Sequence, residues 1–261
     1  MIFESHAHYD DERFDSDRVE LLSLMPKKNI GRIINVGSTL ESSRGCLELS
    51  RDYDFIYAAI GVHPSDISCL EEEVDGLQWL YETAKKEKKV VSIGEIGLDY
   101  YWDKEKDVQI KQRQRFLEQL DIAKQLDLPV IIHSRDAAEE TFQIMKDAAA
   151  RGIRGVIHCY SYSPELAEEY VKLGYYIGVG GVVTFKNGKK LKETVRRIPL
   201  KKILTETDCP YMAPTPFRGE RNDSTFIPYV IQEIAKLKEI TEAEVIDVTW
   251  KNGFELFSKV K

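Results

Sequence analysis

The sequence lacks any apolar run that approaches the ~20 residues a membrane-spanning helix needs. Its first residues, MIFESHAH, also lack the basic segment and apolar core of a signal peptide. These two absences predict a cytoplasmic protein with no membrane partner. Low-complexity tracts, solenoid-type repeats and interdomain linkers are missing as well, so we expect one domain over residues 1–261.

Cysteine is scarce, and positive charge is not in excess. The four cysteines are widely spaced and form no CxxC pair: Cys46, Cys69, Cys159 and Cys209. We expect reduced thiols with structural roles, because cytosolic proteins rarely carry disulfides. The net charge of −7 argues against a sequence-independent grip on nucleic acid, which normally depends on neutralising phosphates. Metal ions in a cleft would supply positive charge locally, so a phosphodiester substrate is still allowed.

Short apolar runs alternate with longer amphipathic stretches along the whole chain. The runs are 1–3, 33–36, 55–62, 90–93, 129–132, 155–157, 175–179 and 202–204. Most are aliphatic and unbroken, as in parallel strands that are buried on both faces. Helices are expected at 107–127, 136–150, 164–173, 225–238 and 241–257, the last opening with a capping box. This alternation predicts an α/β fold, a (β/α)8 TIM barrel in a single domain, with an open doubly wound sheet as the alternative.

The few histidines all occupy one kind of position. His6, His8, His63, His133 and His158 each lie at or just beyond the carboxyl end of an expected strand. Glu95 and Asp208 follow the same rule. In a barrel these ends surround one mouth, where active sites lie. Imidazole and carboxylate groups favour divalent ions such as Zn, Mn, Fe, Ni or Co.

The number of candidate ligands favours two ions. They are His6, His8, Glu95, His133, His158 and Asp208. A single structural zinc needs about four ligands, and this set exceeds that number. Two ions bridged by a carboxylate would activate a shared water for phosphoester or amide hydrolysis.

Other polar residues have two readings each. His63 precedes Pro64 and would either contact substrate or shape its loop. Glu4 is a partner for a histidine or a strand-end charge. Asp99 and Glu206 either orient metal ligands or are solvated or salt-bridged carboxylates.

At this point the motifs become specific. The sequence resembles the TatD family of metal-dependent deoxyribonucleases, within the amidohydrolase-like TIM barrels, over nearly its whole length. The resemblance is carried by SHAHYD (5–10), GVHP (61–64), GEIGLDYY (94–101), QRQRFLEQLDIAKQLDLPVIIHSRDA (112–137), HCYS (158–161), GGVVTFKN (180–187), TETDCPYMAP (205–214) and RGERN (218–222). GEIGLDYY and TETDCPYMAP are highly specific, whereas His-x-His alone is not.

The resemblance implies a division of the ligands between two ions. One ion would take His6, His8, Glu95 and Asp208, and the other would take His133 and His158 with Glu95 as the bridge. The resemblance also implies that Asp208 takes the proton of the nucleophilic water, which makes Asp208 and Glu95 the expected catalytic residues. Two divalent ions are expected, drawn from Zn, Mg, Mn, Co and Ni.

Three departures from the family pattern fall outside these ligands. The family usually has aspartate where this chain has Glu4, and glycine where it has Tyr162. The family segment RGKRNEP is RGERNDS at 218–224, with Glu220 in place of a lysine. Metal binding is therefore expected to be intact, and the last two departures bear on substrate preference.

The expected substrate is DNA with single-stranded character or a free end, cleaved by an exonuclease of the 3'–5' type. Basic residues in the segments after strands are Arg135, Lys186, Arg218 and Arg221, and aromatic ones are Tyr100, Tyr101, Trp102, Tyr160, Tyr162, Tyr211 and Phe217. Phosphates would contact the former and unpaired bases would stack on the latter, although such aromatics also commonly pack inside barrels. The substrate-binding residues expected from this set and from GVHP are His63, Arg135, Tyr160 and Arg218.

Two rival functions are left open. An amide, lactone or ester hydrolase, such as an aminoacyl-tRNA deacylase, would use the same ions to polarise a carbonyl. Such barrels often bridge their ions with a carbamylated lysine, and no expected strand here ends in lysine. A non-enzymatic partner-binding protein with a vestigial site is the other rival, although every expected ligand is present. With no coiled-coil heptads, a monomer is expected.

Overall fold

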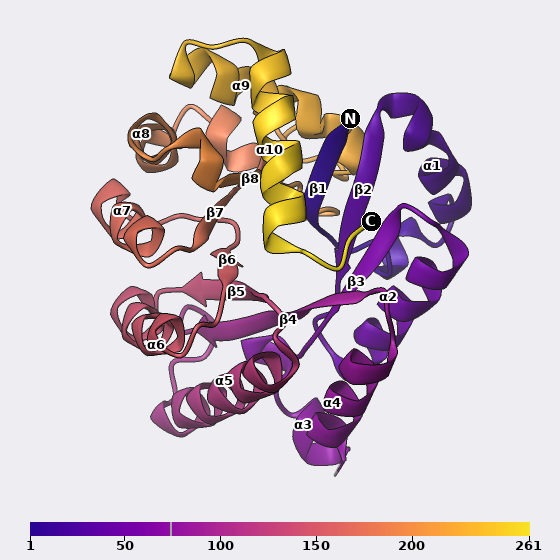
Figure 1. Ribbon diagram of the computed structural model, residues 1–261, viewed down its shortest axis with the longest axis vertical. Helices are drawn as coiled ribbons and strands as arrows, with labels where there is room; N and C mark the ends of the chain where they lie inside the picture. Colours follow the sequence, from indigo (N-terminus) through magenta and orange to yellow (C-terminus); the bar gives the residue numbers. More distant parts are fainter. Residues whose placement is uncertain (74) are drawn as a thin grey trace. The chain divides into compact units, whose positions relative to one another are not determined.

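The computed structural model describes residues 1–73 and 75–261. Its strands are β1 (Ile2–Ala7), β2 (Ile30–Val36), β3 (Ile56–Ile60), β4 (Val90–Asp99), β5 (Val130–Arg135), β6 (Gly155–Ile157), β7 (Tyr176–Val179) and β8 (Ile203–Thr205) (Figure 1). The strands follow one another in the sheet in chain order, with parallel pairing and helices between them. The predicted (β/α)8 fold class is confirmed, and the open doubly wound order is not found.

The helices are α1 (Arg18–Leu24), α2 (Leu40–Asp52), α3 (Cys69–Glu72), α4 (Gly76–Lys86), α5 (Lys106–Leu126), α6 (Ala138–Ala150), α7 (Pro164–Lys172), α8 (Lys189–Arg197), α9 (Ile227–Lys238) and α10 (Glu242–Leu256). The five helices expected from amphipathic stretches are found as α5, α6, α7, α9 and α10, with ends that differ by one or two residues, and no bounds are predicted for the other helices. Short 3-10 turns are η1 (Glu12–Phe14), η2 (Pro26–Lys28), η3 (Pro64–Asp66), η4 (Gly181–Thr184), η5 (Leu200–Lys202) and η6 (Ser224–Phe226). Among the described residues, no helix combines the length and apolarity needed to span a membrane.

The chain packs as two compact units. The first comprises Met1–Asn35 and Cys159–Glu255, and the second comprises Val36–His158 and Leu256–Lys261. The first unit holds β7, β8, β1 and β2 in that lateral order, because β7 pairs with β8, a bridge joins Ala7 to Cys209, and β1 pairs with β2. The second unit holds β3, β4, β5 and β6 in succession. The single domain expected over 1–261 stays a prediction.

In the first unit, α10 packs on β1. The ring of Phe3 makes edge contacts with Trp250 and Phe254, with centroids 6.2 and 5.7 Å away. The predicted capping box starts this helix: Glu244 accepts from the Thr241 N–H at 2.8 Å, and its own N–H donates to Thr241 Oγ1 at 3.2 Å. A well-defined helix start and an aromatic contact thus fix β1, the strand that carries His6.

In the second unit, α5 lies along β4 (Figure 1). Phe116 and Leu120 are buried as the amphipathic pattern predicted, but Leu117 is 36% exposed. Two buried glutamines lie beside the apolar residues and hydrogen-bond to strand ends. Gln112 accepts from the Asp99 N–H at 3.0 Å, and Gln119 accepts from the Val62 N–H at 2.8 Å. These bonds fix the segments that follow β3 and β4, where site residues lie.

Candidate metal centre

The first ligand cluster is built by β1 and the segment that follows β8. The β1·β2 register shifts between Glu4 and Ala7, so β1 contains a bulge at the point where His6 lies. Bulges re-aim side chains and are common beside active sites. The Asp208 N–H donates to the His6 carbonyl at 3.0 Å, which places Asp208 against this bulge.

His6, His8 and Asp208 converge within this unit. Their candidate ligand atoms all lie within 4.8 Å of one another. His6 Nε2 and His8 Nε2 are 3.0 Å apart, and Asp208 Oδ1 is 3.6 and 3.4 Å from these two nitrogens. His6 is fully buried, whereas the Asp208 side chain is 18% exposed. Two imidazole nitrogens and a carboxylate oxygen at this spacing are a donor set suited to a divalent ion.

Glu4 lies beneath this cluster and is fully buried. Its Oε1 accepts from the N–H groups of His6 and Thr207 at 3.1 and 2.9 Å, and its Oε2 accepts from the hydroxyls of Thr207 and Ser224 at 2.8 and 3.0 Å. Burial outweighs these bonds and raises the pKa of Glu4 to about 8. Glu4 is therefore a buried residue whose hydrogen bonds link β1 to the segment after β8, rather than a strand-end charge.

The second cluster is centred on Glu95, which lies inside β4. The strand is longer than the apolar run 90–93 predicted, because it continues to Asp99. Between Ile93 and Ile96 the register with β5 shifts by one residue, so Glu95 also occupies a bulge. At Gly97, φ is +150°, and a Cβ atom there would lie 1.9 Å from the His133 carbonyl oxygen. Glycine is required at this close approach of β4 to β5.

Three histidines of the second unit surround the Glu95 carboxylate. Glu95 Oε1 lies 2.6 Å from His158 Nε2, 2.9 Å from His133 Nδ1 and 3.8 Å from His63 Nε2. The ligand atoms of His63, Glu95 and His133 lie within 4.8 Å of one another. His158 directly follows β6, and its N–H donates to the Ile132 carbonyl at 3.1 Å, beside His133 on β5. This second donor set is again imidazole and carboxylate.

Asp99 holds the far side of the His133 ring. Its Oδ2 lies 3.0 Å from His133 Nε2, which places a proton on Nε2 and leaves Nδ1 facing Glu95. Burial alone would lower the pKa of His133, but hydrogen bonds to Asp99 and Glu95 outweigh it and raise the pKa to about 9. The same contact with His133 lowers the pKa of Asp99 against the effect of burial. Asp99 thus orients the ring of His133, a candidate ligand.

His63 has the loop-shaping role, one of its two expected roles, and its contact with substrate stays a prediction. Its Nδ1 accepts from the Ser65 N–H at 3.2 Å, which begins η3 and shapes the loop. Its Nε2 nevertheless faces Glu95. Burial, followed by the nearby charge of His133, lowers the pKa of His63 to about 3, so the ring is neutral near pH 7. Glu206, the other carboxylate expected to orient ligands, accepts from the Cys159 N–H at 2.6 Å and is fully buried.

The residues expected to contact substrate differ in exposure. Arg135 is exposed at the end of β5, 3.9 Å above the ring of Tyr101, and Arg218 is exposed over Phe185 at 4.1 Å. Tyr160 is only 2% exposed, and its hydroxyl donates to the Ser163 carbonyl at 2.6 Å. Its position favours packing over stacking on a base.

Two further residues of the expected substrate set are already engaged. The Arg221 guanidinium pairs with Asp17 at 2.5 Å, which does not favour the phosphate contact suggested by the sequence. Phe217 stacks on Phe226 with centroids 4.4 Å apart. The partner of Arg221 could not be seen in the local sequence, because Asp17 lies 204 residues away.

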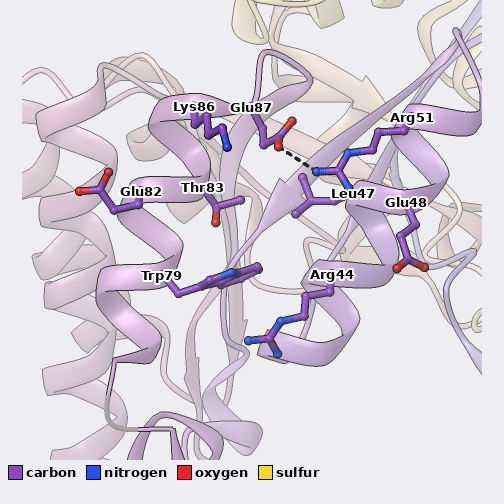
Figure 2. Close-up of a pocket in the computed structure, with 9 residues that line it drawn as sticks. All are labelled: Arg44, Leu47, Glu48, Arg51, Trp79, Glu82, Thr83, Lys86 and Glu87. Carbon is purple, nitrogen blue, oxygen red and sulfur yellow. Dashed lines mark hydrogen bonds and ion pairs between the residues drawn. The ribbon is translucent and has the colours of Figure 1, made fainter.

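A pocket in the second unit lies between α2 and α4, away from these ligands in the sequence. Figure 2 shows the ring of Trp79 beside Arg44, and Glu87 paired with Arg51. The Arg44 guanidinium lies 4.6 Å from the Trp79 ring centroid. The described residues that line the pocket include no histidine or cysteine, and Glu87 is ion-paired, so the pocket does not resemble a metal or hydrolytic site.

Comparison with known proteins identifies the family of this chain. The family described as TatD related DNase matches residues 3–258. The uncharacterized metal-dependent hydrolase YabD of Bacillus subtilis (strain 168) is 44% identical over 258 residues, covering 98% of this chain and 99% of that protein. The uncharacterized metal-dependent hydrolase YcfH of Escherichia coli (strain K12) is 32% identical, covering 98% of this chain and 96% of that protein.

A solved structure extends the similarity to the fold. The crystal structure of YJJV, a TatD homolog from Escherichia coli K12, superposes with a TM-score of 0.90 at 32% identity and covers 98% of each chain. The match spans the strands that carry both ligand clusters. The chain therefore belongs to the TatD related DNase family.

Proposed function

We propose that this chain, a metal-dependent hydrolase of the TatD family, is a deoxyribonuclease that cleaves DNA phosphodiester bonds from an end, in the 3'–5' direction. The observation that carries the proposal is that each compact unit builds its own cluster of imidazole and carboxylate donors. Both clusters suit divalent ions and neither contains a thiolate. The family description supports DNA as the substrate class.

Two ions would occupy the clusters. His6, His8 and Asp208 would hold one, and His133 and His158 would hold the other, with Glu95 as the bridge that the family resemblance implies. Zn, Mn, Co and Ni suit this donor set, and Mg is a further candidate. When bound, such ions lower the pKa of a water and clamp the attacking and leaving oxygens of a phosphodiester.

The protein side chains would have separate tasks. Asp208 would accept the proton of the attacking water, because its side chain is 18% exposed whereas that of Glu95 is 5% exposed. Asp99 would hold the proton of the neutral His133 ring on Nε2, so that Nδ1 is the nitrogen left to bind the ion. His63, neutral near pH 7, would donate a hydrogen bond to a phosphate oxygen rather than a full charge.

The substrate itself would be held by groups outside the ligands. Arg135 and Arg218 are exposed and carry positive charge in a chain of net charge −7. We propose that they bind phosphates next to the scissile bond, which positions the strand without reading its sequence. We also propose a cytoplasmic monomer, for which size-exclusion chromatography would give about 30.0 kDa.

One panel tests this function against its rival. Metal-stripped protein is incubated with labelled single-stranded DNA, an aryl phosphodiester and a set of esters, with Mg, Mn, Zn or Co added back singly. We expect metal-dependent cleavage of DNA and of the diester, abolished by Asp208→Asn and by Glu95→Ala but not by the exposed control Asp247→Asn. Faster cleavage of the esters than of DNA would favour an acyl hydrolase. Equal activity in wild type and both ligand variants would exclude both enzymes.

A further inference from the structure

Exposed aromatic rings gather where β4 ends. Within residues 1–73 and 75–261, the exposed large aromatic side chains are Tyr101, Trp102 and Tyr211, with exposed fractions of 42, 67 and 48%. Two of these three, Tyr101 and Trp102, lie on one turn two and three residues after Asp99. An indole left two-thirds exposed adds little to the core, whereas large rings contribute strongly to binding when a ligand covers them.

An arginine lies against both rings of this turn. The Arg135 guanidinium is 3.9 Å from the Tyr101 ring centroid and 5.5 Å from that of Trp102. The two rings meet edge to face, with centroids 4.8 Å apart and planes at 85°. No carboxylate of the described residues lies within ion-pair distance of Arg135. The turn therefore presents an uncompensated positive charge together with exposed aromatic faces.

The same carboxylate that orients His133 also holds this turn. Asp99 Oδ1 accepts from the N–H groups of Tyr101 and Trp102 at 3.0 and 3.1 Å, while its Oδ2 bonds to His133 Nε2. Asp99 is paired in register with Arg135 across β4 and β5. The two rings therefore lie two and three residues after Asp99, which contacts the candidate ligand His133, and Arg135 lies beside Asp99 on the neighbouring strand. A substrate whose phosphate lies at that ligand would extend over the turn.

We propose that Tyr101, Trp102 and Arg135 form a subsite for one unpaired nucleotide, a proposal that rests on the deoxyribonuclease function above. The indole face stacks on the base, and the guanidinium binds a phosphate of the same strand. A paired base shows only its edge to such a platform, because its faces are covered by its neighbours in the duplex. The subsite therefore gives the enzyme a preference for single-stranded DNA and for no particular base.

Kinetics on two substrates test the subsite. Trp102→Ala is expected to raise KM for a labelled single-stranded oligonucleotide by about 5- to 100-fold, as for loss of one base stack. Trp102→Phe should keep most of the affinity, and both variants should hydrolyse an aryl phosphodiester without a base at wild-type rates. Arg135→Ala should also weaken DNA binding and lower its salt dependence by about 0.7 in the log–log slope. Val19→Ala, which removes an exposed apolar group from the first unit, is the matched control.

An abasic nucleotide identifies the base as the partner. Placing it at successive positions from the 3' end should raise the wild-type KM at one position, and Trp102→Ala should show no further increase there. In the inactive Asp208→Asn background, single-stranded DNA should quench tryptophan fluorescence, and Trp102→Phe should remove most of that quenching.

The failures of the two proposals are distinguishable. If wild type cleaves neither DNA nor the diester, the proposed function fails. If wild type cleaves both, but Trp102→Ala leaves KM for DNA unchanged or slows both substrates equally, the subsite fails.

Discussion

Replacing Asp99 by asparagine should weaken metal binding at the Glu95 cluster without disturbing the neighbouring turn. The asparagine carbonyl can still accept from the N–H groups of Tyr101 and Trp102, as Asp99 Oδ1 does at 3.0 and 3.1 Å. Its NH2 group cannot accept the proton of His133 Nε2, which Oδ2 holds at 3.0 Å. The His133 proton would then move to Nδ1, the nitrogen that faces Glu95, and block it as a ligand.

The magnitude follows from the bond that is lost. A hydrogen bond to a charged group contributes ~1.5–3 kcal/mol, which corresponds to an affinity loss of about 10- to 100-fold. Protons compete with the metal ion for His133, so the measured loss of metal affinity depends on pH. With the pKa of His133 at about 9, an incoming ion must displace a proton at pH 7, and wild-type affinity rises up to about tenfold per pH unit until pH 9. Removing the Asp99 charge lowers that pKa and eases this competition.

The expected result is therefore a loss that grows with pH. At pH 9 the variant should bind Zn or Mn about 10- to 100-fold more weakly than wild type, and at pH 7 the difference should be smaller. Competition with a chromophoric chelator measures both affinities, and the exposed Asp107→Asn is the control. Equal affinities at pH 9, or a loss that is the same at every pH, would refute the role given to Asp99.

Two further predictions concern stability. The folded pKa of Glu4 is raised from 4.5 to about 8, so its protonated form stabilises the fold below pH 4.5 and this contribution is lost as pH rises through 8. Glu4→Gln should therefore lose less melting temperature than wild type between pH 5 and 9, and a parallel decline in both proteins would contradict this. Gly97→Ala should lower the free energy of unfolding by about 3 kcal/mol or more, because its Cβ would lie 1.9 Å from the His133 carbonyl oxygen. Denaturant unfolding measures this value. Gly174→Ala is the control, because Gly174 also has a positive φ (+97°) but a Cβ there would meet no atom within 4 Å, so its loss reports backbone strain without a clash.

Residue type and strand position predicted which imidazole and carboxylate side chains lie close together; their role as ligands stays a prediction. Imidazole and carboxylate side chains at the ends of apolar runs can be found without coordinates, and the parallel topology brings neighbouring strand ends together. The structure places His6, His8 and Asp208 in one cluster and Glu95, His133 and His158 in another. The division of ligands between two ions is still a proposal.

Features that depend on register or on distant partners could not be predicted. The bulges at His6 and Glu95 are properties of two paired strands, and neither strand alone encodes them. The hydrogen bonds of Glu4 join it to Thr207 and Ser224, more than 200 residues away in the chain. The burial of Tyr160 likewise results from packing, so its sequence position alone suggested a substrate contact.

Ions held by the two clusters should be required for DNA hydrolysis. The rate of single-stranded DNA cleavage should be measured against the number of divalent ions bound per chain, determined by elemental analysis after stepwise reconstitution of stripped protein. We predict no cleavage without metal and full activity at two ions per chain. Glu95→Ala should bind fewer than two ions and should not reach wild-type activity. Wild-type cleavage rates in fully metal-free protein would contradict the account.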